Sequence, residues 1–283
     1  MSKEDITIVI NTFKSDEKIN ICLGSIYSNY KVILIENSEN TDFKNQIEAN
    51  YPNVECHLTG ENLGYAKGNN LGLSKVKSKY ALILNPDAKL EKDTLENFLN
   101  ATKKLKDFSI IGPAKQDEYS ISDLNFNNQE FKEVDSLKGF AMFLNLEQFK
   151  DVGFFDENFF IYLEEIDLCK RLRKKGKKIY LDKKIVIHHL GGSSHNESIN
   201  FEMELSRNWH WMWSMFYFNK KHYGYFNSLR KVSLKFFSSF FKMIFFLLIF
   251  NKEKKKIYFQ RFSGLLNSII GKKSWYRPKI LSD

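Results

Sequence analysis

Cysteine is scarce and scattered in this sequence of 283 residues. Its three cysteines, Cys22, Cys56 and Cys169, are far apart and odd in number, so they indicate neither a disulfide framework nor a zinc site. A reducing, cytoplasmic setting is therefore the simplest expectation. The opening sequence MSKEDITIVI also lacks the basic region and long apolar core of a signal peptide, so we expect no export.

Long apolar runs are missing as well. The unbroken apolar run MIFFLLIF, residues 243–250, has only eight residues, and the wider stretch 236–250 contains Lys242 and two serines. A helix that spans a bilayer needs about 20 predominantly apolar residues. The sequence therefore predicts no membrane-spanning helix.

Acidic residues are nearly absent from the last part of the chain. Residues 206–283 hold 16 Lys and Arg against 2 Asp and Glu, whereas residues 1–205 hold 27 against 32. The same segment holds 21 of the 43 aromatic residues, and this mixture suits an anionic membrane surface. We therefore expect two domains, 1–205 and 206–283. Nucleic acid is the competing partner of a basic protein, but no zinc-knuckle spacing or other nucleic-acid motif is present.

Short apolar runs alternate with amphipathic segments in the first domain. The pattern predicts strands at 6–10, 32–35, 54–58 and 80–84, and helices near 16–28, 41–50, 66–77 and 93–106. Such alternation indicates an α/β fold with a mostly parallel sheet, whose ligands collect beyond the carboxyl ends of the strands. The polar residues 114–136 that follow are interpreted as a surface excursion, with a loop over the site as the alternative.

Polar side chains follow the first two expected strands. Asn11, Thr12 and Phe13 end the first strand, and Glu36 and Asn37 end the second. In a mononucleotide-binding half, base and ribose lie at these positions. Ordinary turn chemistry explains such residues equally well, because Asn hydrogen-bonds its own backbone.

The stretch 62–87 is the most informative part of the chain. NLGYAKGNNLGL precedes the strand-like YALIL and the turn Asn85-Pro86-Asp87. A helix start rich in glycine and asparagine, followed by a strand that delivers an acid at its carboxyl end, is typical of domains that hold a metal-bound diphosphate. We expect the turn to aim Asp87 outward as a ligand of Mg²⁺ or Mn²⁺, although such a tripeptide alone is more often only a turn.

Three acids, Glu164, Glu165 and Asp167, open a further predicted helix beside a run of aromatic residues. The helix dipole by itself favours acids in a first turn. Three acids within four residues exceed what capping needs. A carboxylate in partly apolar surroundings can act as a general base near neutral pH, because desolvation raises its pKa.

Two histidines end the strand-like KKIVIHH, directly before LGGSS. Their rings point to opposite faces of a strand, so at most one faces the site. Neutral imidazole is a good ligand of divalent ions, and we take His188 as the candidate. An ordinary surface histidine is the alternative.

In their order, these motifs resemble the family 2 glycosyltransferases, and within them the rhamnosyltransferase-like branch. The matching elements are INTF, ENS, NLGYAKGNNLG, LNPD, VGFFDENFFIYLEEIDLCKRLRKKG and IHHLGGSS, which together cover roughly residues 5–195. SRNWHWMWSMFYFNKKHYG and RFSGLLNSIIGKK look like that branch's carboxyl-terminal region.

The resemblance implies a GT-A fold and a metal-dependent, inverting transfer of a sugar from a nucleotide diphosphate to a hydroxyl. Asp87 and His188 would contact the divalent ion. Glu165 stands where the family usually has the aspartate that deprotonates the acceptor, and Asp167 is a second candidate for the base or its orienting partner. The implied donor-side residues are Asn11, Thr12, Phe13, Glu36, Asn37, Asn62, Gly64, Lys67, Asn69, Asn85 and Asp87, and the acceptor-side residues are Phe155, Asp156 and Glu164. Glu36, like Glu165, replaces a usual aspartate.

The resemblance also favours dTDP-rhamnose as donor, with a UDP-hexose or UDP-N-acetylhexosamine as the alternative. The implied acceptor is a lipid-linked or growing saccharide in bacterial surface-polysaccharide synthesis. The tail adds a membrane-facing pattern: apolar residues recur at helical spacing, and lysines mark another face. These sets are Val232, Phe236, Phe240, Ile244 and Leu247, and Lys231, Lys235, Ser238 and Lys242. We expect a helix in the inner interface of the plasma membrane; a packed hairpin or a homodimer contact is the alternative.

Two other functions are weighed. A nucleotidyltransferase would need a glycine-rich, basic loop after the first strand, and INTFKSDEK supplies none. A non-catalytic, membrane-associated scaffold with a decayed transferase domain is the alternative of another class, motivated by the glutamates at Glu36 and Glu165.

Overall fold

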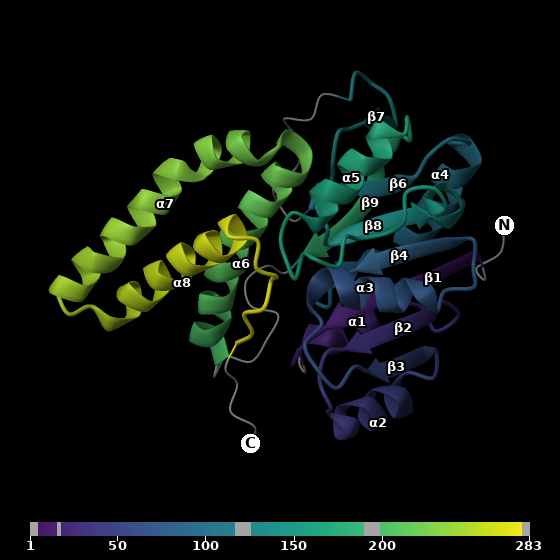
Figure 1. The fold of residues 1–283 in the computed structure, drawn as a ribbon. Coiled ribbons are helices and arrows are strands. Elements are labelled where there is room, and N and C mark those ends of the chain that lie inside the picture. The colour runs from purple at the N-terminus through teal and green to yellow at the C-terminus, as the bar shows by residue number, and fades with distance from the viewer. Residues whose placement is uncertain (1–4, 16–17, 117–125, 190–198, 279–283) are drawn as a thin grey trace. The chain divides into compact units, whose positions relative to one another are not determined.

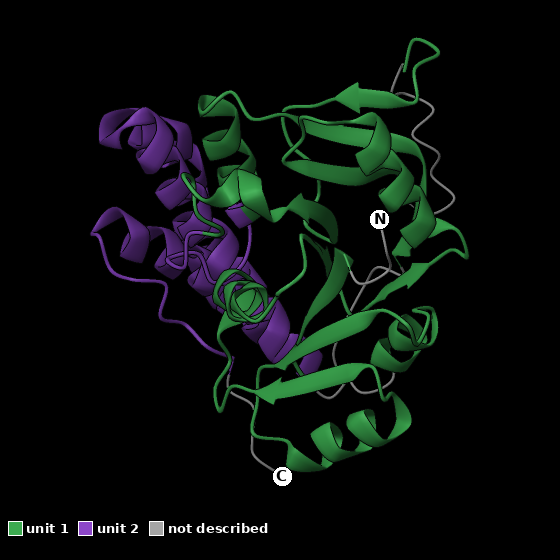
Figure 2. Ribbon diagram, turned by 90° about the vertical axis from the view of Figure 1, so that its right-hand side faces the viewer, with its two compact units in different colours: residues 1–155, 165–196 green, residues 156–164, 197–283 purple. Residues whose placement is uncertain are grey.

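The computed structural model describes residues 5–15, 18–116, 126–189 and 199–278. The chain divides into two compact units, residues 1–155 with 165–196, and residues 156–164 with 197–283 (Figure 2). The boundary expected after residue 205 falls inside helix α6 (Asn200–Tyr223), so the helical unit begins earlier than the composition suggests. It also takes up the short segment 156–164, which leads into the predicted acidic helix.

The first unit begins with the alternating strands and helices that the sequence predicts (Figure 1). Four parallel strands lie in the order β3-β2-β1-β4, which places their carboxyl ends at one edge. Their bounds are β1 (Ile6–Thr12), β2 (Lys31–Glu36), β3 (Val54–Leu58) and β4 (Tyr80–Leu84); the helices are α1 (Lys18–Gly24), α2 (Thr41–Asn50), α3 (Gly64–Ser74) and α4 (Thr94–Lys104). These expected strands and helices are confirmed.

The sheet continues from β4 with antiparallel pairings. β8 (Ala141–Asn145) runs antiparallel to β4 and to β6 (Ile110–Gln116), and β9 (Ile179–His189) runs parallel to β6. Two short strands, β5 (Ala88–Leu90) and β7 (Phe131–Glu133), pair antiparallel with β9. Helix α5 (Glu164–Lys174) precedes β9. Part of the expected surface excursion, residues 117–125, lies outside the described residues.

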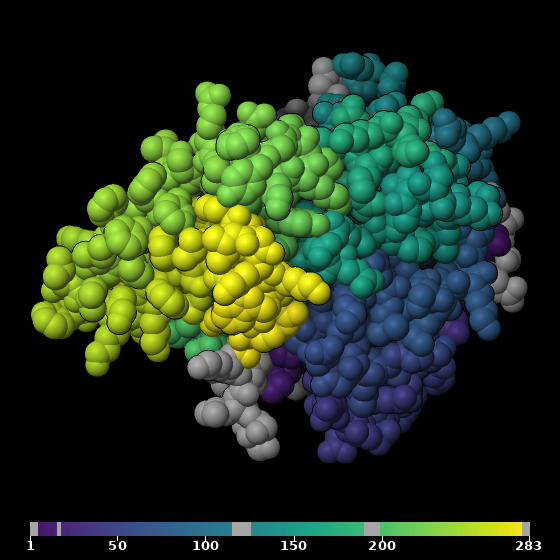
Figure 3. Space-filling model, viewed as in Figure 1, coloured from purple at the N-terminus to yellow at the C-terminus, as the bar shows by residue number. Residues whose placement is uncertain are grey.

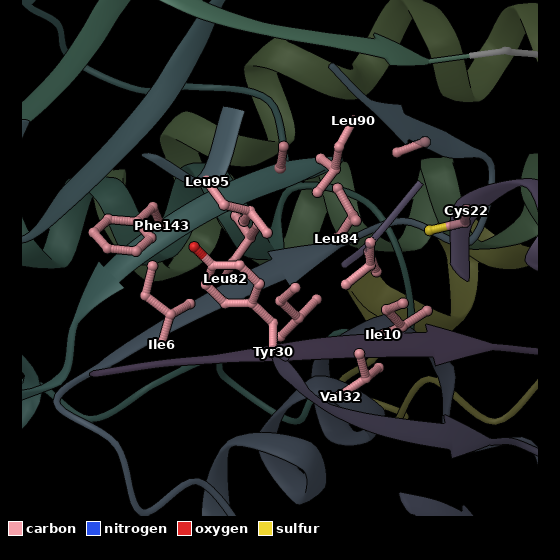
Figure 4. Packing of buried hydrophobic residues seen from close by; sticks show 14 of the residues in the cluster. Ile6, Ile10, Cys22, Tyr30, Val32, Leu82, Leu84, Leu90, Leu95 and Phe143 are labelled. Carbon is pink, nitrogen blue, oxygen red and sulfur yellow. The ribbon is translucent and has the colours of Figure 1, made fainter. Parts of the chain in front are cut away.

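The core of this unit lies against the parallel strands, which are apolar along their length because they are covered by other elements. Ile10, Val32 and Leu82 are fully buried there, and Figure 4 shows their side chains packing from neighbouring strands. Phe143 of β8 stacks on Phe98 of α4 with ring centroids 4.7 Å apart. Since this packing fixes the strands, it also fixes the residues that follow them.

The second unit consists mainly of α6, α7 (Tyr225–Leu248) and α8 (Lys252–Ile269). α8 lies close against α6: a Cβ added at Gly264 would overlap the carbonyl oxygen of Trp209. α7 packs on α8 through Val232, which is buried, and through Phe236, whose ring centroid is 4.9 Å from that of Phe262. Within the described residues, no helix has the length and apolar character needed to cross a membrane.

The packing of α7 corrects the predicted orientation of the tail. The row expected to face lipid includes Val232, Phe236 and Phe240, and this row turns toward α8 instead. The period of 3.6 residues predicts which residues form the apolar row, but it does not show whether lipid or another helix covers that row.

A buried histidine ties the end of the chain to α6. The ring of His210 lies with Nε2 at 2.9 Å from the carbonyl oxygen of Tyr276 and Nδ1 at 3.0 Å from the hydroxyl of Ser274. A carbonyl only accepts, so Nε2 carries the proton and Nδ1 accepts from the serine. Burial lowers the pKa of His210 to about 3, so the ring is neutral near pH 7.

We predict that acid destabilises the helical unit through His210. The folded-state pKa lies below the ordinary value of 6.5, so its contribution is fully present above pH 6.5 and is lost as the pH falls toward 3. Between pH 7 and 5, this histidine should lower the free energy of unfolding by about 2 kcal/mol. Urea denaturation of the wild type and His210→Gln at both pH values measures the difference, and an equal pH dependence in the two proteins would contradict the assignment.

Candidate active site

The turn after β4 brings an acid and a histidine together. The backbone N–H of Ala88 donates to the carbonyl of Asn85 at 3.1 Å and closes the turn. Asp87 is buried rather than projecting into solvent, and its Oδ1 lies 3.2 Å from Nε2 of His189. That oxygen accepts no well-aligned hydrogen bond, so the pair leaves an acceptor available in a buried place.

The pairing of β5 with β9 decides which histidine reaches Asp87. Ala88 is opposite His189 and Lys89 is opposite His188, so the two rings lie on different faces of the strand. His188 instead places Nε2 2.6 Å from Oε1 of Glu91, in a pair that is largely exposed. The structure therefore places His189 beside Asp87, rather than His188, which was the expected metal contact.

Two residues that the sequence reasoning missed connect this pair with the acidic helix. Phe140 lies with its ring centroid 4.9 Å from that of His189, and its carbonyl accepts from the N–H of Asn85 at 2.8 Å. A Cβ built on the preceding Gly139 would be 3.5 Å from Cβ of Glu165. The Gly139-Phe140 segment therefore lies between the Asp87 turn and Glu165; a glycine-aromatic pair before a buried strand was the only sequence signal.

Tyr65 of α3 is a third residue that was missed, although it lies inside the NLGYAKGNN motif. Its hydroxyl donates to the carbonyl of Gly139, and its ring meets Phe155 edge-on at 5.6 Å. The side chain of Asn70, also on α3, donates to the carbonyl of Phe155 at 2.9 Å and accepts from its N–H at 3.0 Å. Helix α3 thus holds both the Gly139 segment, which lies beside Glu165, and the Phe155 segment.

Three asparagines of the expected donor site bind the protein itself. Asn11 donates to the carbonyl of Gly64 at 2.9 Å, and Asn37 donates to Asn11 and to the carbonyl of Thr12. Asn62 accepts from the N–H of Gly64 at 3.0 Å. These side chains fasten the ends of β1 and β2 to the start of α3, where Gly64 has a φ of +77° that favours glycine. In this structure they therefore position the strand ends, and their expected contact with the donor stays a prediction.

Other residues at this edge keep polar oxygens without a hydrogen-bond partner. Thr12 Oγ1 and Asn69 Oδ1 are buried in this state, as is Asp87 Oδ1. A buried polar atom that stays unpaired costs about 1–3 kcal/mol, so such atoms mark a place where a ligand would supply the partner. Glu36 is buried at the end of β2. Of the remaining predicted donor-side residues, Lys67 is exposed, and Phe13 and Asn85 are half-buried.

The acidic helix divides its three carboxylates among different surroundings. Asp167 is fully buried, and its Oδ2 accepts from Nε of Arg171 at 2.8 Å. Arg171 also donates to the carbonyls of Val152, at 2.9 Å, and Phe154. This ion pair holds the loop before the helix, an arrangement that favours the orienting role among the two expected for Asp167. Glu165, half-buried, is the carboxylate that lies beside Gly139.

The backbone before α5 has an unusual conformation. Tyr162 and Leu163 have φ angles of +75° and +68°, which residues other than glycine rarely adopt. Such residues cost about 1–3 kcal/mol each and persist where the surrounding structure fixes them, often at functional sites. They orient the first turn of α5, where Glu164 is buried and Glu165 follows.

Asp156, expected on the acceptor side, is engaged within the helical unit. Its Oδ2 accepts from Nζ of Lys221 at 2.7 Å and from the hydroxyl of Tyr217 at 3.0 Å. Burial alone would raise the pKa of Asp156, but the hydrogen bonds from Lys221 and Asn158 outweigh it and hold the pKa below its usual value. Asp156 therefore anchors its segment to α6, and its expected contact with the acceptor stays a prediction.

Among the described residues, no three side chains of His, Cys, Asp or Glu gather into a metal-binding group. Asp87 and His189 could supply two ligands, and a Mg²⁺ or Mn²⁺ ion would then take further oxygens from phosphates and water. The LGGSS part of the last motif lies in residues 190–198, outside the described residues.

Comparisons with known proteins identify the family of this chain. Residues 7–168 match the family described as Glycosyl transferase family 2. The chain is 27% identical over 215 residues to the rhamnosyltransferase WbbL of Escherichia coli, covering 64% of this chain and 79% of that protein. It is 24% identical over 207 residues to the N-acetylglucosaminyl-diphospho-decaprenol L-rhamnosyltransferase of Mycobacterium tuberculosis, covering 58% and 67%.

A third relative is the low-salt glycan biosynthesis hexosyltransferase Agl10 of Haloferax volcanii, 25% identical over 199 residues. That match covers 62% of this chain and spans 64% of the Haloferax protein. Among solved structures, the mannosyltransferase PcManGT from Pyrobaculum calidifontis, in complex with GDP-Man and Mn²⁺, aligns with a TM-score of 0.60 at 11% identity, over 94% of this chain and 87% of that one. TarS of S. aureus aligns with 0.55 at 13%, over 71% and 38%. These likenesses confirm the expected GT-A fold.

Proposed function

This chain belongs to family 2 of the glycosyltransferases, and on that premise we propose that it transfers a sugar, with inversion, from a nucleotide diphosphate to a hydroxyl of a lipid-linked saccharide. The proposal depends chiefly on one observation. A buried oxygen of Asp87 lacks a hydrogen bond beside His189, at the edge of the sheet where α/β folds bind nucleotides.

The names of the relatives support particular substrates. Two of them are rhamnosyltransferases, which favours dTDP-rhamnose as the donor over a UDP-hexose or UDP-N-acetylhexosamine. The Mycobacterium name includes a diphospho-decaprenol acceptor, which supports a lipid-linked saccharide as the acceptor here. The reaction would then serve surface-polysaccharide assembly at the cytoplasmic face of the plasma membrane.

The residues present fit a divalent ion. Asp87 offers a carboxylate oxygen and His189 an imidazole, and both suit Mn²⁺ or Mg²⁺ when phosphates complete the coordination. When bound, the ion would act as a Lewis acid and offset charge on the leaving diphosphate. Phe140 packs on the His189 ring and limits its movement.

Glu165 would act as the general base. It would take the proton of the acceptor hydroxyl as that oxygen forms a bond to the anomeric carbon, while the bond from this carbon to the diphosphate oxygen breaks and its electron pair leaves with the phosphate. Attack from the face opposite the leaving group inverts the anomeric centre. The hydrogen bond from Tyr65 to Gly139 supports the backbone beside Glu165, and the Asp167–Arg171 pair fixes its helix.

We predict that the two neighbouring histidines differ in metal-dependent donor binding. His189→Ala should raise the Kd of UDP and dTDP in the presence of Mn²⁺ by at least about tenfold, because one ligand of the ion is removed. His188→Ala, the same change on the opposite face of β9, should leave the Kd unchanged. Isothermal titration calorimetry with and without Mn²⁺ measures both.

Equal effects of the two substitutions would contradict the assignment of His189. If the wild type bound neither nucleotide, nor any dTDP- or UDP-sugar, the transferase proposal would fail in favour of a non-catalytic scaffold.

We also predict that Glu165 and Asp167 separate catalysis from stability. Glu165→Gln should lower kcat by roughly 10²–10⁴-fold with donor Kd unchanged, because the proton loses its acceptor. Asp167→Asn should lower the free energy of unfolding by roughly 2–4 kcal/mol, because it breaks a buried ion pair. Transfer assays at saturating donor, together with urea denaturation, distinguish these effects. The roles are reversed if Asp167→Asn abolishes turnover in a stably folded protein while Glu165→Gln stays active.

A further inference from the structure

Helix α7 is apolar on two opposite faces. One face packs on α8 through Val232 and Phe236, as described above. The other face is exposed to solvent, and Figure 3 shows side chains of α7, in light green, standing out along the helix. This exposed stripe consists of Leu234, Phe237, Phe241, Phe245 and Leu248, whose exposed fractions lie between 55% and 83%. At 3.6 residues per turn, these five residues fall within an arc of about 80°.

The stripe continues into the turn that joins α7 to α8. Ile249 and Phe250 lie in this turn, and Phe250 is 88% exposed with a φ of +56°. A bulky residue rarely adopts this backbone conformation, and the side chain of Phe250 is almost completely exposed to solvent. A contiguous apolar surface of this kind marks an interaction site rather than ordinary exposure.

Positive charge surrounds the apolar surface. Lys231, Lys235 and Lys242 are exposed on α7, and at helical spacing they lie about 80–120° from the middle of the stripe, all on one side. The first turns of α8 add Lys252, Lys254, Lys255 and Lys256, all exposed. Glu253 is the single acid in the sequence between residues 225 and 278.

We propose that the exposed stripe of α7 and the apolar turn after it insert shallowly into an anionic bilayer, with the surrounding lysines at the headgroups. A second copy would bring the same lysines against these and repel, whereas anionic lipid complements them. Because no described helix is long and apolar enough to span, the insertion stays in the interface. This inference rests on the proposed function and extends it. It names the surface that would bring the enzyme to a lipid-linked acceptor.

Vesicle binding tests this surface in the full chain. The wild type should float with vesicles of phosphatidylglycerol and phosphatidylcholine, and bind pure phosphatidylcholine at least about tenfold less tightly. Phe241→Ser/Phe245→Ser/Phe250→Ser should reduce binding to the anionic vesicles by at least about tenfold. Ile21→Ser, which removes a half-exposed isoleucine of α1, is the matched control and should bind as the wild type does.

Site-specific labels report insertion directly. All three native cysteines are buried, and desolvation raises the pKa of the Cys56 and Cys169 thiols to about 12, so a thiol-reactive fluorophore should select an introduced cysteine. An environment-sensitive dye on Phe241→Cys or Phe250→Cys should brighten and shift to the blue when anionic vesicles are added. The dye on Ile21→Cys should not change.

Each other outcome overturns the inference. Binding that survives the triple substitution would place the membrane contact elsewhere, and unchanged emission at 241 and 250 would exclude their insertion. A concentration-dependent dimer that the triple variant lacks would assign the surface to a second copy. Nucleotide binding with Mn²⁺, measured on the same preparations, separates the two proposals. A wild type that binds nucleotide but not anionic vesicles would contradict only the membrane inference.

Discussion

The pairing of β5 with β9 is the constraint on which the candidate active site depends. It sets Ala88 opposite His189 and so brings the imidazole to 3.2 Å from the carboxylate of Asp87. A slip of one residue would exchange His189 for His188, whose partner is an exposed glutamate. The chemistry proposed for the metal ion therefore follows from the register of a strand of three residues.

Some polar groups around the Asp87–His189 pair have hydrogen-bond partners, and others do not. Asn11 and Asn37 bond to the backbone and to each other, and this holds the strand ends at the start of α3. Thr12, Asn69 and Asp87 keep buried oxygens that lack a hydrogen bond. Acceptors that lack a hydrogen bond, held by rigid surroundings, are what the proposed donor site requires, since unpaired buried oxygens persist only where surrounding structure holds them.

Much of this arrangement could be predicted from local sequence. Short apolar runs predicted the parallel strands. Asp87 and Glu165 were identified because Asp87 follows an apolar run and Glu165 follows a run of aromatic residues. The choice between His188 and His189, the internal bonds of Asn11 and Asn37, and the engagement of Asp156 by Lys221 depend on residues distant in sequence. The apolar row of α7 was found too, but spacing alone does not show that α8 covers one face and leaves the opposite face exposed.

The two units contribute in different ways. The first carries Asp87, His189 and Glu165, and the second carries the basic helices together with the segment that ends at Glu164. The chain thus passes from the helical unit into the acidic helix between Glu164 and Glu165.

Pulsed electron paramagnetic resonance of Mn²⁺ with UDP or dTDP, on protein carrying ¹⁵N-labelled histidine, would examine the metal pair itself. We expect a ¹⁵N coupling to the bound Mn²⁺ in the wild type and in His188→Ala, and its loss in His189→Ala. A wild-type spectrum without that coupling, or a coupling lost in His188→Ala, would contradict the role given to the Asp87–His189 pair.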